Sequence, residues 1–276
     1  MGNLPDIFHP ASPNHAAMFA RLFSAVLTIQ LLISFRDQYL YFKSQPSRIY
    51  GKPARLLGRF RLPVLSASQF MDVGFLLLLS LVFIVIGFLP RLFALSALIC
   101  YVFYFNSILS LAYVQRKTNL LPLVLLILVV SPSVDEHLFA ASTTWELVLV
   151  KIGLSQVYLS AGIQKLQQSG WDWCTGRSVQ AYLLENYLWS DRRAGLLVAQ
   201  NRKLCAVLAT LTLAFELTFW IIIFIPSLTC IYLAAVVLFH TGTLATMRIN
   251  YGKYLLPVYM VFFTDLAFWA KDKFGL

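Results

Sequence analysis

The sequence is poor in charged residues. Only 12% of its 276 residues are charged, whereas a typical soluble domain carries about 25%. Hydrophobic residues make up 59%, and the mean hydropathy is +0.73. This composition excludes an ordinary soluble domain and predicts a polytopic membrane protein. No Lys or Arg precedes the first apolar run, so we expect no signal peptide.

Motifs for metal, phosphate and acyl-transfer chemistry are also missing. The sequence has no His-x-x-His, Cys-x-x-Cys or Glu-x-x-His, no Gly-rich phosphate loop and no G-x-S-x-G elbow. Three of the four cysteines lie in apolar stretches, which favours small buried side chains over a disulfide framework. We therefore expect no metal site. We interpret the net charge of +10 as a signal of topology and anionic lipid, and expect no nucleic-acid partner.

Long apolar runs dominate the sequence. A membrane span needs about 20 mostly apolar residues, and such runs are too long for barrel strands. We therefore predict an all-α transmembrane bundle forming one domain over residues 1–276. Its eight predicted spans are about 16–35, 69–90, 92–114, 119–132, 144–166, 203–225, 228–247 and 251–270. The fourth is short enough to be tilted, re-entrant or covered by its neighbours.

Two polar segments interrupt these spans. Residues 36–68 form a basic loop, and residues 167–202 form a loop rich in Trp and Tyr. Within the second, residues 177–189 are expected to form an interfacial helix after the fifth span, with one side made by Val179, Tyr182, Leu183 and Tyr187.

The basic residues indicate an orientation. Connections after odd-numbered spans hold most of the 22 Lys and Arg, and the opposite side holds Arg91, Lys271 and Lys273. We predict that the odd connections, including the loops beside Lys165, face the cytoplasm. The expected location is the bacterial cytoplasmic membrane.

Ionisable residues inside the predicted spans are costly and invite a functional interpretation, since a charge at the bilayer centre costs roughly 3 kcal/mol. They are Arg21, Asp72, Glu146, Lys151, Lys165, Glu216, His240 and Asp265. We expect Arg21, Glu146 and Asp265 to snorkel or be hydrated, because they lie near span ends.

The fifth span carries an unusual stripe. Lys151, Tyr158 and Lys165 recur every seven residues and so lie near one helix face. Two interpretations stay open: the stripe faces a cavity or the bundle interior, or the two lysines snorkel to opposite interfaces about 21 Å apart. Glu216 and His240 lie deep in the sixth and seventh spans, where Glu216 must be protonated, paired or hydrated.

A longer block joins these residues to a known family. Residues 156–182 read QVYLSAGIQKLQQSGWDWCTGRSVQAY. The block resembles the A-G-x-x-K-L…D-W-x-x-G pattern of the vitamin K-dependent γ-carboxylase-like (HTTM) membrane proteins. Further likenesses in the same order are Ser133-Val134-Asp135, Phe215-Glu216 and Phe239-His240.

The resemblance implies a chemistry. The carboxylases use a lysine at this position as a base toward a reduced naphthoquinone, which reacts with oxygen and then allows a peptide glutamate to be carboxylated. By this likeness Lys165 and His240 are the catalytic candidates, and Trp173 and Glu216 line or support the cavity. The seven-residue stripe adds Lys151 and Tyr158 to the residues expected to line it. The implied class is a quinol-dependent carboxylase or epoxidase, a lyase and oxidoreductase acting in peptide maturation.

Two departures bear on the substrate. Gln164 stands in place of the carboxylases' second lysine, and their large C-terminal soluble region has no counterpart here. A separate soluble partner protein is therefore expected to supply recognition of a peptide substrate. The alternative is a non-catalytic membrane partner or maturation factor for a peptide or toxin complex. A transporter ranks third, because no pair of broken helices with matching repeats is present.

Overall fold

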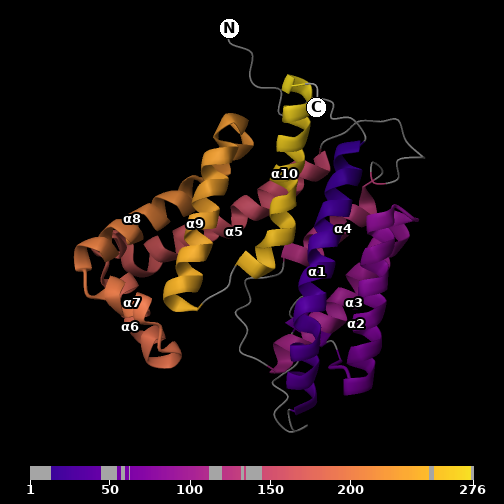
Figure 1. Cartoon of the computed structure of the whole chain (residues 1–276), viewed down its shortest axis with the longest axis horizontal. Coiled ribbons are helices and arrows are strands. Elements are labelled where there is room, and N and C mark those ends of the chain that lie inside the picture. The colour runs from indigo at the N-terminus through magenta and orange to yellow at the C-terminus, as the bar shows by residue number, and fades with distance from the viewer. Residues whose placement is uncertain are drawn as a thin grey trace. The chain divides into compact units, whose positions relative to one another are not determined.

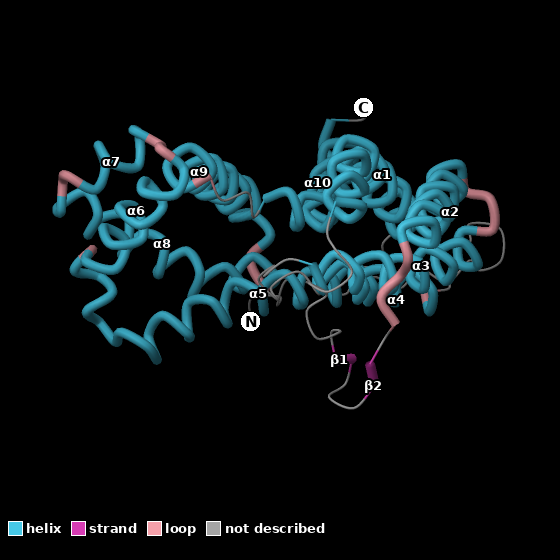
Figure 2. Tube along the Cα trace, turned by 90° about the horizontal axis from the view of Figure 1, so that it is seen from below, coloured by secondary structure: helices cyan, strands magenta, loops and turns pink. Residues whose placement is uncertain are grey.

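The computed structural model describes residues 14–44, 55–56, 60–61, 63–111, 120–131, 134, 145–248 and 252–274. This part of the chain is almost entirely helical (Figure 1). Its strands are β1 (Arg55–Leu56) and β2 (Phe60–Arg61), which pair antiparallel over two residues (Figure 2). The predicted all-α class is confirmed. The basic loop expected at 36–68 begins later than predicted, because residues 36–44 continue α1. Much of the rest of that loop lies outside the described residues, as do the basic pair Arg116 and Lys117, and Ser133 with Asp135.

The long helices follow the apolar runs. They are α1 (Asn14–Ser44), α2 (Ala67–Ile86), α3 (Pro90–Leu111), α4 (Leu120–Val130), α5 (Trp145–Ser169), α8 (Arg202–Thr218), α9 (Thr229–Met247) and α10 (Gly252–Phe274). Within the described residues, six helical stretches are long and apolar enough to cross a membrane, and the apolar helices Leu120–Val130 and Leu255–Ala267 are shorter. The chain is therefore a multi-pass membrane protein, and the count of eight crossings stays a prediction.

The chain divides into two compact units. Among the described residues, one unit holds those from 151 to 254, and the other holds those before 151 and after 254. We call them the α5–α9 unit and the α1–α4 unit; the second also holds the first turn of α5 and most of α10.

The α1–α4 unit is organised around an aromatic stack. Phe35 of α1, Phe70 of α2 and Tyr104 of α3 stack with ring centroids 4.5–6.3 Å apart. A Cβ at Gly74 would lie 2.2 Å from the Phe35 ring, so glycine lets that ring lie against α2. The Tyr104 hydroxyl donates to Gln38 Oε1 at 2.5 Å and ties α3 to α1. The core of this unit thus combines apolar packing with a neutral hydrogen bond.

Glu146 corrects an expectation in the same unit. We expected it to snorkel or be hydrated, but it is only 2% exposed, and the Ser131 hydroxyl donates to its carboxylate at 2.8 Å. The residue lies in the first turn of α5, where neighbouring segments cover it. Arg21 and Asp72, by contrast, are exposed. Position near the end of a predicted span therefore does not by itself guarantee contact with solvent.

The aromatic segment 167–202 is structured in the α5–α9 unit. It forms the 3₁₀-helix η2 (Gly170–Thr175), α6 (Arg177–Ser190) and α7 (Arg193–Ala199). A cluster of Leu183, Ala199 and Cys205 joins α6 and α7 to the first turn of α8. A Cβ at Gly195 would lie 2.4 Å from the carbonyl oxygen of Thr246, so glycine allows α7 to lie against the end of α9. The polar segment therefore packs where α8 begins and α9 ends.

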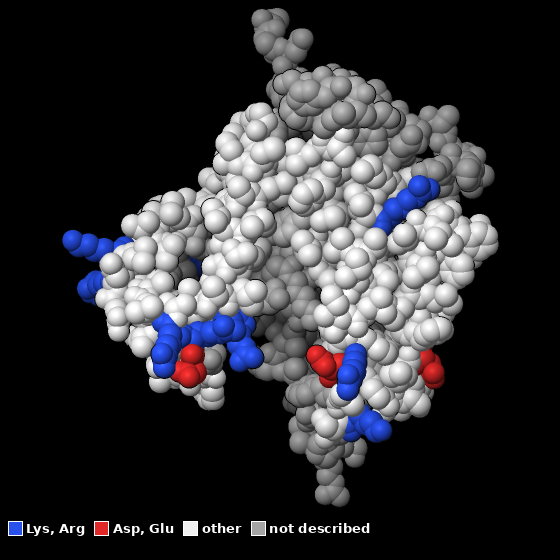
Figure 3. Space-filling view, viewed as in Figure 1, with Lys and Arg blue, Asp and Glu red and all other residues white. Residues whose placement is uncertain are grey.

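The predicted helix at 177–189 is present, but its expected side is not continuous. Leu183 is 1% exposed inside the cluster with Ala199 and Cys205, whereas Tyr182 is 51% exposed. Val179 and Leu183, four residues apart, share one helix face, and Tyr182 lies about 100° away from Leu183. The apolar face of α6 therefore packs on α7 and α8. Lys and Arg side chains gather over this end of the unit (Figure 3).

Candidate functional site

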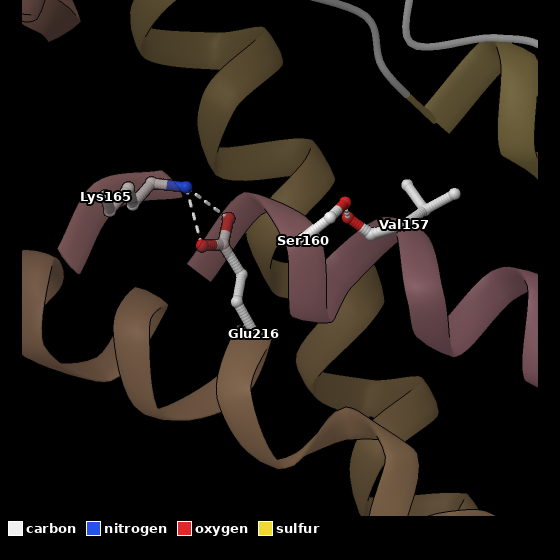
Figure 4. A network of polar contacts seen from close by, with 4 residues as sticks. All are labelled: Val157, Ser160, Lys165 and Glu216. Atoms are coloured by element: carbon white, nitrogen blue, oxygen red, sulfur yellow. Dashed lines mark hydrogen bonds and ion pairs between the residues drawn. The ribbon is translucent and has the colours of Figure 1, made fainter. Parts of the chain in front are cut away.

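The site begins where α5 and α8 approach closely. A Cβ on Gly162 would lie 2.9 Å from Leu217 Cδ2 and 3.2 Å from Glu216 Cβ. Glycine at this point lets the two helices come together, and one turn further along α5 the side chain of Lys165 faces Glu216 of α8 (Figure 4). The small residue in the A-G-x-x-K-L block thus sets the helix spacing that the ion pair needs.

Lys165 and Glu216 form the charged centre of the site. Lys165 Nζ donates to both carboxylate oxygens, at 2.6 Å to Oε1 and 2.5 Å to Oε2. The Glu216 side chain is 4% exposed and that of Lys165 is 21% exposed. Of the three states open to a deep carboxylate, the structure shows pairing. For Lys165 the contact favours the first interpretation of the stripe, in which the side chain faces the bundle interior, because its ammonium turns to Glu216 of α8.

Trp173 covers the ammonium from the side of η2. Lys165 Nζ lies 5.3 Å from the Trp173 ring centroid, within the range of a cation–π contact. The ring is 9% exposed and packs on Ala209 and Leu213. Its Nε1 is buried and has no hydrogen-bond partner among the described residues. A buried N–H donor without a partner is uncommon and fits a site that receives an oxygen acceptor from a ligand.

The turn after η2 fixes the position of this tryptophan. Gly176 has φ +77° and ends η2, and its N–H donates to the Trp173 carbonyl at 3.2 Å. A Cβ at Gly176 would lie 2.3 Å from the backbone nitrogen of Ala206. Positive φ and this contact with α8 both favour glycine. The glycine of the W-x-x-G segment thus forms the turn that positions Trp173 beside Lys165.

Tyr158 and His240 form a second polar contact of the same unit. The Tyr158 hydroxyl and His240 Nε2 are 2.9 Å apart, joining α5 to α9. Tyr158 is 3% exposed, and aromatic side chains surround the pair. They are Phe215, Phe219, Tyr232 and Phe239, with neighbouring ring centroids 4.4–6.1 Å apart. Seven residues of helix, about 10 Å, separate Tyr158 from Lys165.

The sequence-predicted residues therefore fall into distinct groups. Lys165, Glu216 and Trp173 come together, and Tyr158 contacts His240 along the same helix. Lys151 is half-buried about 21 Å along α5 from Lys165, beyond direct contact with the charged centre.

Sequence reasoning missed the aromatic surround and the role of Gly162. The signal was present in part, because Phe215 and Phe219 are four residues apart and share a face of the helical segment. Tyr232 also carries a hydroxyl that donates to Thr218 at 2.8 Å, so a polar aromatic side chain links α9 to the end of α8.

Comparisons with protein-family models, curated proteins and solved structures gave no match. The likeness to the γ-carboxylase-like family therefore rests on the motifs quoted from the sequence. The geometry adds a local reason for two of them: Gly162 spaces the helices and Gly176 positions Trp173.

Proposed function

We propose that the chain is an integral membrane enzyme related to vitamin K-dependent γ-carboxylase, with Lys165 as the base of a reaction that uses a reduced quinone and oxygen. One observation carries the proposal: an amine in a short two-oxygen contact with a carboxylate that is 4% exposed in a membrane-spanning helix. Such pairs are expensive to place in a bilayer and often mark a functional site. A peptide is the proposed final substrate.

The residues around Lys165 fit the oxygen end of a quinol. Trp173 Nε1 offers a buried donor, and Leu166, Leu217, Ala209 and Leu213 provide an apolar wall. Quinol and quinone oxygens accept hydrogen bonds, so Trp173 and Lys165 would hold that end of the ring. When bound, a reduced naphthoquinone supplies the reducing equivalents for reaction with oxygen.

Proton movement within the ion pair prepares Lys165 to act as a base. An ammonium has no lone pair, so one proton must leave before the amine can accept another. Glu216 Oε2 lies 2.5 Å from Nζ and is placed to take that proton. The transfer changes ammonium and carboxylate into amine and carboxylic acid, and it brings no net charge into the bilayer. Glu216 thus acts as the proton acceptor of Lys165, a more specific role than lining a cavity.

His240 has a supporting role in this proposal. It contacts the Tyr158 hydroxyl, which lies about 10 Å along α5 from Lys165. That distance lets a flat ring reach from the charged centre toward the aromatic surround of Tyr158. Tyr158 holds the imidazole of His240 in one orientation, and His240 would face the far end of the ligand.

The test uses purified full-length protein in lipid nanodiscs. Mass spectrometry of the lipid extract is expected to find bound quinone, and added reduced naphthoquinone should give oxygen uptake and the epoxide. Lys165→Ala should abolish both oxygen uptake and epoxide formation. Lys165→Arg is the sharper variant, because arginine keeps the pair with Glu216 but does not lose its proton in proteins. Wild-type protein with neither quinone affinity nor oxygen uptake would overturn the proposal.

A non-catalytic partner for a peptide complex is the second candidate. The same ion pair favours it, because two charges that satisfy each other also form a strut between α5 and α8. Replacing a buried ion pair by apolar residues is often neutral for stability. If the pair only stabilises the packing of α5 on α8, the double variant Lys165→Met/Glu216→Leu should therefore keep its function. An enzyme carrying the same double substitution should be folded and inactive, which separates the two functions.

A further inference from the structure

The junction between α6 and α7 exposes large apolar side chains. Leu188 is 81% exposed and Trp189 is 85% exposed. Asp191 then ends α6 with φ +51°, and Arg192 and Arg193 follow in exposed positions. We name residues 188–193 the α6–α7 tip. Tryptophan and leucine this far from the core are unfavourable in water, and exposed apolar side chains of this kind mark contact surfaces.

The tip is held at the end of the membrane-spanning helices. Leu183, one turn before it, packs on Cys205 of α8 and beside Met247 of α9. Gln180 donates to the carbonyl of Ala199 at 2.7 Å and fastens α6 to α7. The candidate spans α8 and α9 begin and end at this point, so the tip lies beside the ends of two apolar helices. These contacts fix α6 and the start of the tip against the ends of these helices.

The charges around the tip are mainly positive. The basic residues at the ends of α6, α7, α8 and α9 are Arg177, Arg192, Arg193, Arg202, Lys203 and Arg248, and the acidic residues of η2 and α6 and at the end of α6 are Asp172, Glu185 and Asp191. Trp171 of η2, also near this end, is 76% exposed. Tryptophan prefers the interface between headgroups and acyl chains, and Arg binds phosphate oxygens. An anionic leaflet is complementary to both features.

We propose that the α6–α7 tip inserts into an anionic leaflet, with Leu188 and Trp189 at the acyl-chain boundary and Arg192 and Arg193 on lipid phosphates. The occupant is the bilayer around the chain's own spans, because those spans place lipid beside the tip. In this proposal the end of α6 lies at the membrane interface, whereas the sequence predicted that the whole helix 177–189 would lie along it. The apolar face of α6 stays inside the protein, and the end of the helix contacts lipid.

The test places an environment-sensitive probe at the tip. In full-length protein with the four cysteines replaced by alanine, Trp189→Cys is labelled with a nitrobenzoxadiazole dye. Glu185→Cys, exposed one turn earlier on α6, is the matched control. In vesicles of phosphatidylcholine with phosphatidylglycerol, emission from position 189 should shift to the blue and that from position 185 should stay water-like. Emission from position 189 that is no bluer than that from position 185 would overturn the proposal.

The role of charge is tested with the same probe. Arg192→Gln/Arg193→Gln should remove the extra blue shift that phosphatidylglycerol gives over phosphatidylcholine alone. Arg192→Lys/Arg193→Lys keeps both charges and should retain that shift. A blue shift that does not depend on phosphatidylglycerol would overturn the anionic part of the proposal. Elution of each variant at the wild-type volume shows that the fold is intact, and none of these readouts depends on enzymatic activity.

Discussion

The two units of the chain use the same structural devices with different chemistry. In the α1–α4 unit a tyrosine, Tyr104, links two helices through Gln38, and in the α5–α9 unit Tyr158 links two helices through His240. Each unit also has a glycine that allows close packing, Gly74 against the Phe35 ring and Gly162 against α8. Glutamine does not titrate and phenylalanine has no reactive group, whereas the side chains of histidine, lysine and glutamate can each take up or release a proton.

The difference separates packing from chemistry within one membrane protein. In the α1–α4 unit the tyrosine and the glycine support an aromatic stack. In the α5–α9 unit they hold groups that can give or take a proton, and a buried tryptophan donor stands beside them. Paired substitutions, one in each unit, therefore test which unit carries function and which carries stability.

The largest expected effect comes from breaking the ion pair on one side. Glu216→Leu leaves the Lys165 ammonium without its partner inside the bundle and should destabilise the protein by about 3 kcal/mol. The double variant Lys165→Met/Glu216→Leu should recover most of that loss. Thermal unfolding in one detergent, followed by circular dichroism, gives both values. Equal destabilisation of the single and double variants would show that the pair contributes packing and little electrostatic energy.

The elements of this unit show what could be predicted from sequence. Long apolar runs located α5, α8 and α9, because the length of a span is set by the bilayer. The partner of Glu216 could not be deduced, because pairing across 51 residues depends on the rotation of two helices about their axes. The same applies to α6, where the spacing predicted the helix but not that Leu183 turns inward and Tyr182 outward. In the α1–α4 unit, the burial of Glu146 depends on tertiary contacts, which hydropathy does not describe.

Substituting the two close-packing glycines should have an intermediate effect. Gly162→Ala places a methyl group 3.2 Å from Glu216 Cβ, and Gly74→Ala places one 2.2 Å from the Phe35 ring. Overpacking of this kind costs roughly 1–3 kcal/mol, so both variants should unfold at lower temperature. Gly162→Ala alone should also reduce quinol-dependent oxygen uptake, because it moves α8 away from Lys165. A similar loss of oxygen uptake in Gly74→Ala would contradict the division of roles.

The smallest expected effect on stability comes from removing the two tyrosine hydroxyls. Tyr104→Phe and Tyr158→Phe each remove a hydrogen bond between helices and should each cost about 1 kcal/mol. Their effect on function should differ, because Tyr158 orients an imidazole and Tyr104 orients an amide. Only Tyr158→Phe is expected to change the oxygen-uptake rate and its dependence on quinol concentration. If both variants changed the rate equally, His240 would have no special orientation to lose, and its supporting role in the α5–α9 unit would be wrong.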